Sequence, residues 1–134
     1  MRILKKDAPR PVLKKPIFTH MKNVNPSASG ANVFAKILSV KKVEDALRNS
    51  EGKVLTEVLL GDSTASAILN LTDPKYDDLK AGDVVALRNL KVVVVKGFVR
   101  LEIDPWGKIT KENFDIPEVN RDFNVSAILY ELKQ

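Results

Sequence analysis

The sequence contains no cysteine in 134 residues and only one histidine. Without cysteine, disulfides and thiolate metal ligands are excluded, which fits a reducing compartment. The longest apolar runs have four residues, as in Val92–Val95, which is the size of a strand and far below the roughly 18 residues of a membrane-spanning helix. The charged N-terminus also lacks the apolar segment of a signal peptide. These absences predict a cytoplasmic or nuclear protein without a membrane partner.

Catalytic patterns are equally scarce. His20 lies in a turn-rich segment with no nucleophile motif beside it. Asp77 and Asp78 are adjacent, so on a helix their side chains would point apart, and a solvated face near the helix N-terminus explains them better than a carboxylate pair. No phosphate-binding loop, zinc-ligand spacing or nucleophile elbow occurs. We therefore predict a non-enzymatic protein with no catalytic residues, no metal and no cofactor.

The positive charge is concentrated in the first fifteen residues. They contain six basic side chains and one acidic one, a net +5, which equals the net charge of the whole chain. The basic residues are Arg2, Lys5, Lys6, Arg10, Lys14 and Lys15. Prolines at positions 9, 11 and 16 disfavour a helix, so residues 1–16 are predicted to be a flexible basic arm. Such an arm fits phosphate binding, and a solubilising tail or a localisation signal is the alternative.

Alternating and β-branched stretches predict five strands separated by polar turns. They cover approximately residues 33–40, 53–60, 65–71, 83–95 and 98–104. In the last of these, Val99, Leu101 and Ile103 are predicted to face inward. Gly61–Thr64 has the composition of a tight hairpin turn, and a bend in the long fourth strand is expected near Arg88–Asn89.

Two other segments complete the expected fold. Asp73 suits an N-cap, Pro74 the first helical position and Gly82 a helix end, which predicts a short helix between the third and fourth strands. Tyr76 and Leu79 would pack its inner side. Residues 108–122 look like a polar spacer, and 123–132 is predicted as a terminal strand because of its β-branched and aromatic content.

This order of elements is that of the oligonucleotide/oligosaccharide-binding (OB) fold. We predict an all-β, five-stranded Greek-key barrel with a short helix between strands three and four and an added C-terminal strand. The expected organisation is an arm over residues 1–16, the barrel over 17–110, and a C-terminal extension over 111–134 whose terminal strand packs on the barrel.

A series of four segments resembles the single-stranded-nucleic-acid-binding OB proteins of the replication protein A-like group. The segments are VLLGDSTASAIL at 58–69, LKAGDVV at 79–85, VVKGFVRL at 94–101 and DPWGKI at 104–109. The resemblance covers roughly residues 18–110. The segments WGKI at 106–109 and LYEL at 129–132 are similar to those of small stand-alone OB proteins of plants and protists.

The resemblance also shows departures from the family pattern. Binding members often carry aromatic platforms where this chain has Leu71, Val95 and Glu102. Stacking on an aromatic contributes about 1–3 kcal/mol per base, so these departures predict weak binding, or a preference for structured RNA and ribonucleoprotein surfaces. Phe98 and Trp106 are expected to substitute in part.

Cations and aromatics of the predicted strands could together line one face of the barrel. The candidate nucleic-acid-binding residues are Phe34, Lys36, Lys41, Lys42, Arg88, Lys91, Lys96, Phe98, Arg100 and Trp106. This combination of phosphate attraction and base stacking is typical of single-strand grooves. A solvated wall of mixed charge is the alternative, because Glu57, Glu102 and Asp104 are nearby.

The sequence thus predicts a nucleic-acid-binding OB protein acting on single-stranded DNA or RNA, alone or within a ribonucleoprotein. The rival hypothesis is a protein-interaction module with little affinity for nucleic acid, in which residues 125–132 pair with a partner or a second copy. The expected state is a monomer or weak homodimer. Spacing does not distinguish DNA from RNA, because that choice depends on contacts to the 2′-hydroxyl.

Overall fold

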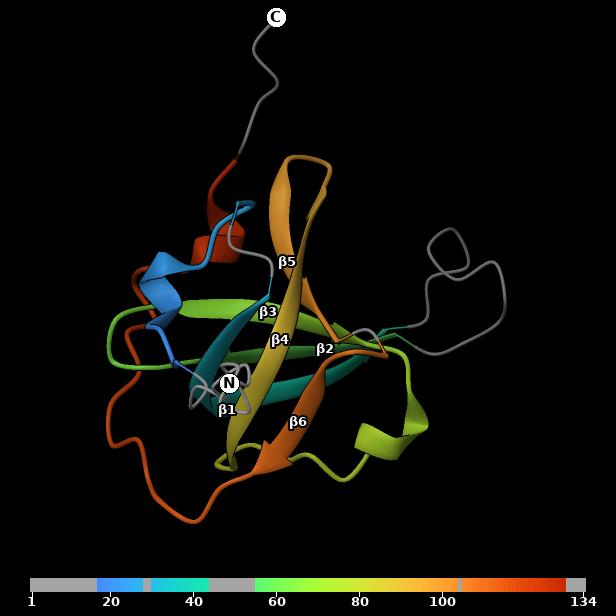
Figure 1. Cartoon of the computed structure of the whole chain (residues 1–134), viewed down its shortest axis with the longest axis vertical. Coiled ribbons are helices and arrows are strands. Elements are labelled where there is room, and N and C mark those ends of the chain that lie inside the picture. The colour runs from blue at the N-terminus through green and yellow to red at the C-terminus, as the bar shows by residue number, and fades with distance from the viewer. Residues whose placement is uncertain (1–16, 28–29, 44–54, 104, 130–134) are drawn as a thin grey trace, which may run out of the picture.

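The computed structural model describes residues 17–27, 30–43, 55–103 and 105–129, which form a closed six-stranded barrel (Figure 1). The strands are β1 (Ala31–Val43), β2 (Leu55–Gly61), β3 (Ser66–Leu71), β4 (Val84–Val95), β5 (Phe98–Glu102) and β6 (Lys108–Lys111). Three short 3-10 turns accompany them: η1 (Met21–Asn23), η2 (Pro74–Tyr76) and η3 (Val125–Ala127). The strand order is β1-β2-β3-β5-β4-β6, and β1 also pairs with β4. The predicted OB barrel is confirmed.

The barrel closes through β1, which pairs with β2 along one half and with β4 along the other. The register shifts between Ile37 and Ser39, and an extra residue of this kind bends a strand and increases its twist. Lys36 lies at the crossover, opposite Gly61 of β2 and Val84 of β4. Before the shift, inward and outward residues alternate as predicted from the sequence.

A single apolar core fills the barrel. Its fully buried side chains come from every strand except β6 and include Val33, Ile37, Val58, Leu60, Leu69, Leu87, Leu90, Val99 and Leu101. Met21 and Val24 of the N-terminal segment and Val125 of η3 are buried against the same core. The segments that flank the barrel in sequence therefore contribute to its stability.

Positive backbone φ angles shape both the bend and the turn of the β4–β5 hairpin. Lys96 (φ 53°) and Gly97 (φ 91°) form the two-residue turn, and positive φ at both positions matches the twist of the flanking strands. Asn89 (φ 54°) bends β4 where the sequence predicted a bend. Its side chain donates to the Trp106 carbonyl at 3.2 Å, which ties the β5–β6 connection to this bend.

The predicted helix after Asp73 is shorter than expected. Asp73 does cap the turn by accepting from the Lys75 N–H at 3.0 Å, but only Pro74–Tyr76 is helical. The Gly82 N–H donates to the Ile37 carbonyl at 2.8 Å, so the chain must return to β1 within a few residues. That constraint leaves room for a 3-10 turn and a bend but not for a full helix.

The C-terminal part differs from the prediction in two places. The predicted spacer contains β6, which pairs with the first half of β4 and has only Ile109 buried. The predicted terminal strand is instead η3 with isolated bridges, Ser66 to Asn124 and Phe98 to Leu129, within the part described to residue 129. The Asn124 side chain accepts from the Ser126 N–H at 2.9 Å and turns the chain out of an extended path.

Asp62 organises the β2–β3 turn and attaches the N-terminal segment. Its carboxylate accepts from the backbone N–H groups of Met21 (2.9 Å), Thr64 (2.8 Å) and Ala65 (3.2 Å), and from the Thr64 hydroxyl. Burial raises the pKa of Asp62, but these hydrogen bonds together outweigh it and hold the pKa below its ordinary value of 3.8. The charged form is therefore the one that the folded state stabilises.

We predict that Asp62→Asn lowers the free energy of unfolding by about 1.5–3 kcal/mol near pH 7, because an amide cannot accept all of these bonds. A lowered folded-state pKa adds stability above the unfolded pKa near 3.8, and this stability is lost as the pH falls through the folded-state value. Urea unfolding at several pH values should show a shallower acid-side loss for the variant. The exposed Asp122→Asn is the control; equal slopes for wild type and Asp62→Asn would contradict the assignment.

Candidate nucleic-acid interface

Phe34, a predicted stacking residue, lies within an aromatic cluster of the protein itself. The ring of Phe18 stacks on Phe34 at a centroid distance of 4.0 Å and an interplanar angle of 7°. Phe114 approaches Phe34 edge-on at 5.2 Å. The Arg88 guanidinium lies 5.4 Å from the centre of the Phe18 ring. The N-terminal and C-terminal segments thus cover this part of β1 and occupy the predicted platform.

Lys36 and Arg88 belong to this same outer wall, formed by β1, β4 and β6. Lys36 Nζ pairs with an Asp115 carboxylate oxygen at 3.0 Å, and its side chain is 25% exposed. Arg88 lies opposite Lys108 in the β4–β6 register. In Figure 1, β4 and β6 lie in front of β2 and β3. Lys36 stands at the crossover of β1, where it is opposite both Val84 of β4 and Gly61 of β2.

Residues 123–129, which we call the C-terminal strap, fill part of the seam between β3 and β5. The Phe123 carbonyl accepts from the Ser66 N–H, and the Ser126 hydroxyl accepts from the Ile68 N–H, both at 2.8 Å. Direct β3–β5 pairing begins only at Leu69 opposite Leu101. The strap therefore supplies hydrogen-bond partners for the first part of β3, which β5 does not reach.

Two predicted site residues on β5 contact the strap. Phe98 forms a bridge with Leu129. An Arg100 guanidinium nitrogen donates to the Ser126 carbonyl at 3.1 Å and to the Val99 carbonyl at 2.9 Å. Beyond these contacts β3 and β5 pair directly, with Asn70 opposite Glu102.

Five polar residues form a row across the strands at this directly paired end of the seam. The aligned positions are Lys41 of β1, Glu57 of β2, Asn70 of β3, Glu102 of β5 and Lys91 of β4. The two lysines stand at the ends and the carboxylates flank the centre. The Asn70 Oδ1 atom is buried and has no hydrogen-bond partner among the described residues. The row joins two predicted site residues, Lys41 and Lys91, but places negative charge between them.

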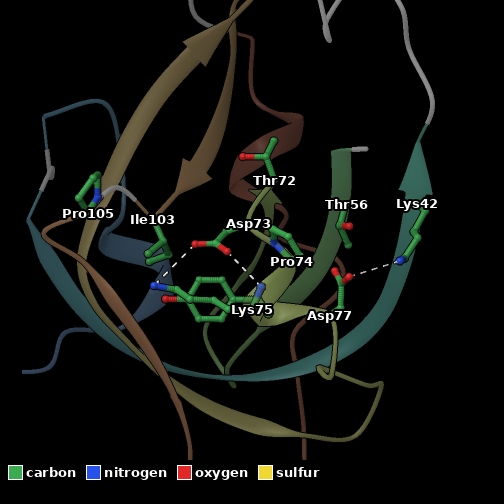
Figure 2. A pocket seen from close by; sticks show the side chains of 10 residues that line it. Lys42, Thr56, Thr72, Asp73, Pro74, Lys75, Asp77, Ile103 and Pro105 are labelled. Carbon is green, nitrogen blue, oxygen red and sulfur yellow. Dashed lines mark hydrogen bonds and ion pairs between the residues drawn. The ribbon is translucent and has the colours of Figure 1, made fainter. Parts of the chain in front are cut away.

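A groove leads from this row to the loop after β3. A depression of about 370 Å³ is lined by Arg100, Asn70 and Glu102, and a second, of about 950 Å³, by Lys42 and Lys75 (Figure 2). The two share the lining residues Thr72, Asp73, Tyr76 and Ile103. We call these two connected depressions the β3–β5 groove.

A third depression extends the groove beyond η2. It measures about 490 Å³, shares Lys75 and Tyr76 with the second, and is lined by Lys108 and Lys111. Tyr76 thus lines all three depressions. From the sequence this residue was interpreted only as a packing residue, because a single Tyr in a turn gives no signal for the cavities around it.

Cations and carboxylates alternate along the groove. Lys42 lies 3.9 Å from Asp77 and Lys75 3.6 Å from Asp73. All four side chains are more than half exposed, and exposed pairs of this kind contribute only about 0–1 kcal/mol each. These lysines can therefore exchange a carboxylate for a phosphate at little cost.

The other predicted residues lie outside the groove. Lys96 is in the turn at the end of the β4–β5 hairpin. Trp106 is 82% exposed in the β5–β6 connection. The six basic residues of the arm, and Asp104, lie outside the described residues. Of the ten predicted barrel residues, Lys42 and Arg100 line the β3–β5 groove.

Within the ranges that the structure describes, three or more His, Asp or Glu side chains are nowhere grouped as metal ligands would be. The same residues include no helix long and apolar enough to cross a membrane.

Comparison with known proteins agrees with the observed fold. Residues 24–111 match the family described as "Single-stranded DNA binding protein Ssb-like, OB fold". The chain belongs to this family. Within the Ssb-like family, the single-stranded DNA binding protein Ssb of Saccharolobus solfataricus is 25% identical over 93 residues, which are 69% of this chain and 63% of that protein.

A plant protein is similar over a greater length. An uncharacterized protein of Arabidopsis thaliana is 28% identical over 131 residues, covering 90% of this chain and 86% of the relative. The solution structure of a hypothetical Arabidopsis thaliana protein is 27% identical, with a TM-score of 0.74 and 92% coverage of both chains. The OB domain of a Thermoplasma acidophilum protein (22% identity, TM-score 0.57, covering 78% of this chain and 95% of that domain) shares the fold.

We predict that Phe34→Ala lowers the free energy of unfolding by about 1–3 kcal/mol, because Phe18 and Phe114 then have no ring to pack against and each aromatic pair contributes roughly 0.5–1.5 kcal/mol. Thermal and urea unfolding measure the change. Trp106→Ala removes a larger but mostly exposed ring and should change stability much less. A greater destabilisation by Trp106→Ala than by Phe34→Ala would show that the Phe18–Phe34–Phe114 cluster does not hold the terminal segments.

Proposed function

We propose that this Ssb-like protein binds single-stranded DNA or RNA along the β3–β5 groove and has no catalytic activity of its own. The observation that carries the proposal is the connected groove between Arg100 and the Lys42–Lys75 pair, in a member of a single-stranded DNA binding family. An extended strand needs such a continuous path, whereas a small ligand needs a single enclosed pocket.

The charge distribution suggests different roles for the groove and the N-terminal arm. The groove itself holds nearly balanced charges, so it offers shape and short-range contacts but little long-range attraction. The net +5 of residues 1–15 supplies the attraction that groove residues lack. Basic arms of this kind contact phosphates without reading sequence and accelerate association.

The test is a titration of the full chain with labelled oligo-dT and oligo-U at several salt concentrations, compared with a chain lacking residues 1–15. We expect both chains to bind, and the truncated one to show a smaller dependence of affinity on salt. The reduction should be roughly 0.7 log units per log unit of salt for each phosphate that the arm no longer neutralises.

Affinities for DNA and RNA oligonucleotides of matched sequence show which of the two nucleic acids is preferred. A sizing column run in parallel tests the rival interaction module. Failure of the full chain to bind any oligonucleotide at low salt, together with a stable dimer, would replace the proposal by that rival.

The carboxylates in the groove provide a second test. Glu102→Gln removes a negative charge from the lining of the groove and should raise the affinity for single strands about two- to fivefold, because a charge roughly 4 Å from a phosphate costs about 1 kcal/mol in water. Fluorescence anisotropy at low salt measures this. Glu118→Gln removes an equal charge from a separate depression near Arg121 and should leave affinity unchanged. Equal effects of both substitutions would mean that the strand does not follow the groove.

A further inference from the structure

Tyr76 is held in place by the short turn η2. The Asp73 carboxylate caps the turn at the Lys75 N–H (3.0 Å), and the Asp77 N–H donates to the Pro74 carbonyl at 3.0 Å. The Leu79 N–H donates to the Tyr76 carbonyl at 3.3 Å. Proline at the first position and bonds on both sides fix the backbone, so the ring is presented from a defined direction.

The ring of Tyr76 packs against the core and is also accessible from the groove. It is half-buried and contacts the apolar core, yet it lines all three connected depressions. The ammonium of Lys75 lies 5.1 Å from the ring centre, and the Lys75 side chain is 64% exposed. A solvent-exposed ammonium over the ring marks a face that the core does not cover.

The surroundings of the ring suit a flat, partly polar group. Pro74, Ile103 and Pro105 offer apolar walls, and the hydroxyls of Thr56 and Thr72 offer hydrogen-bonding groups (Figure 2). Lys42 stands at the edge of the same depression. A nucleobase has this character, with two apolar faces and a polar rim, and its phosphates would lie near the lysines.

We propose that Tyr76 stacks an unpaired base, with Lys75 moving from the ring to a neighbouring phosphate. This inference rests on the proposed function and adds a base subsite at the turn after β3. The ring comes from this turn and not from the strand positions Leu71, Val95 and Glu102, which line one of the same depressions. The exchange is favourable because base–aromatic stacking is stronger than a cation–π contact at an exposed site. The released ammonium gains a phosphate partner in place of Asp73.

The experiment measures affinity for oligo-dT and oligo-U of about 12 nucleotides, within the site size of one OB fold. Tyr76→Phe keeps the ring and should bind like wild type. Tyr76→Leu keeps apolar volume against the core but removes the stacking surface, and should weaken binding about five- to 150-fold. Because no charge changes, the salt dependence should be the same in both variants.

Phe114→Leu is the matched control, since it removes an aromatic ring on the β1 wall and should leave affinity unchanged. If Tyr76→Leu does not fold, the ring protons of Tyr76 in the wild-type chain provide the readout, and stacking should shift them upfield as oligonucleotide is added. If the wild type binds and Tyr76→Leu binds with the same affinity, the base subsite is overturned while the proposed function stands. Wild-type binding that leaves the Tyr76 ring protons unshifted would have the same meaning. Absence of binding by the wild type would instead remove the proposed function.

Discussion

The closure of the barrel through β1 is the constraint on which the rest of the structure depends. One strand of 13 residues serves two partners because its register shifts near Ile37 and Ser39. The Gly82 N–H donates to the carbonyl of Ile37, next to the same register shift, and this contact limits η2 to a single turn. The short η2 in turn leaves Tyr76 at the rim of the groove and not inside a longer helix. A local bulge thereby sets the position of the candidate site.

The terminal segments decide which walls of the barrel are available to a ligand. Phe18 and Phe114 cover the outer face of β1 around Phe34, and the C-terminal strap fills the part of the β3–β5 seam next to Ser66 and Ile68. An apolar or unpaired edge left open there would invite association with other chains. Among the described residues, these terminal segments do not cover the β3–β5 groove or the η2 turn.

Strand positions could be predicted from the sequence because their signals are local. Alternation in β5, the Lys96–Gly97 turn and the bend at Asn89 each depend on a few neighbouring residues. β6 was missed because four residues with one buried side chain give too weak a pattern. Over residues 123–129, the described part of the predicted terminal strand, the prediction was wrong. Residue composition favours extended structure there, but the hydrogen bond from the Ser126 N–H to the Asn124 side chain turns the chain. Such capping competes with strand pairing and overrides propensity.

By itself the sequence determined the barrel, its family and the concentration of excess charge in the N-terminal arm, since periodicity, ordered motifs and net charge need no knowledge of distant contacts. Only the tertiary structure decided which side chains face a common groove. Phe34 and Tyr76 are both aromatic residues near lysines in the sequence, yet one is covered by Phe18 and the other lines three depressions. Whether a side chain can meet a ligand depends on which distant segment packs over it, and contacts between distant segments exist only in the folded chain.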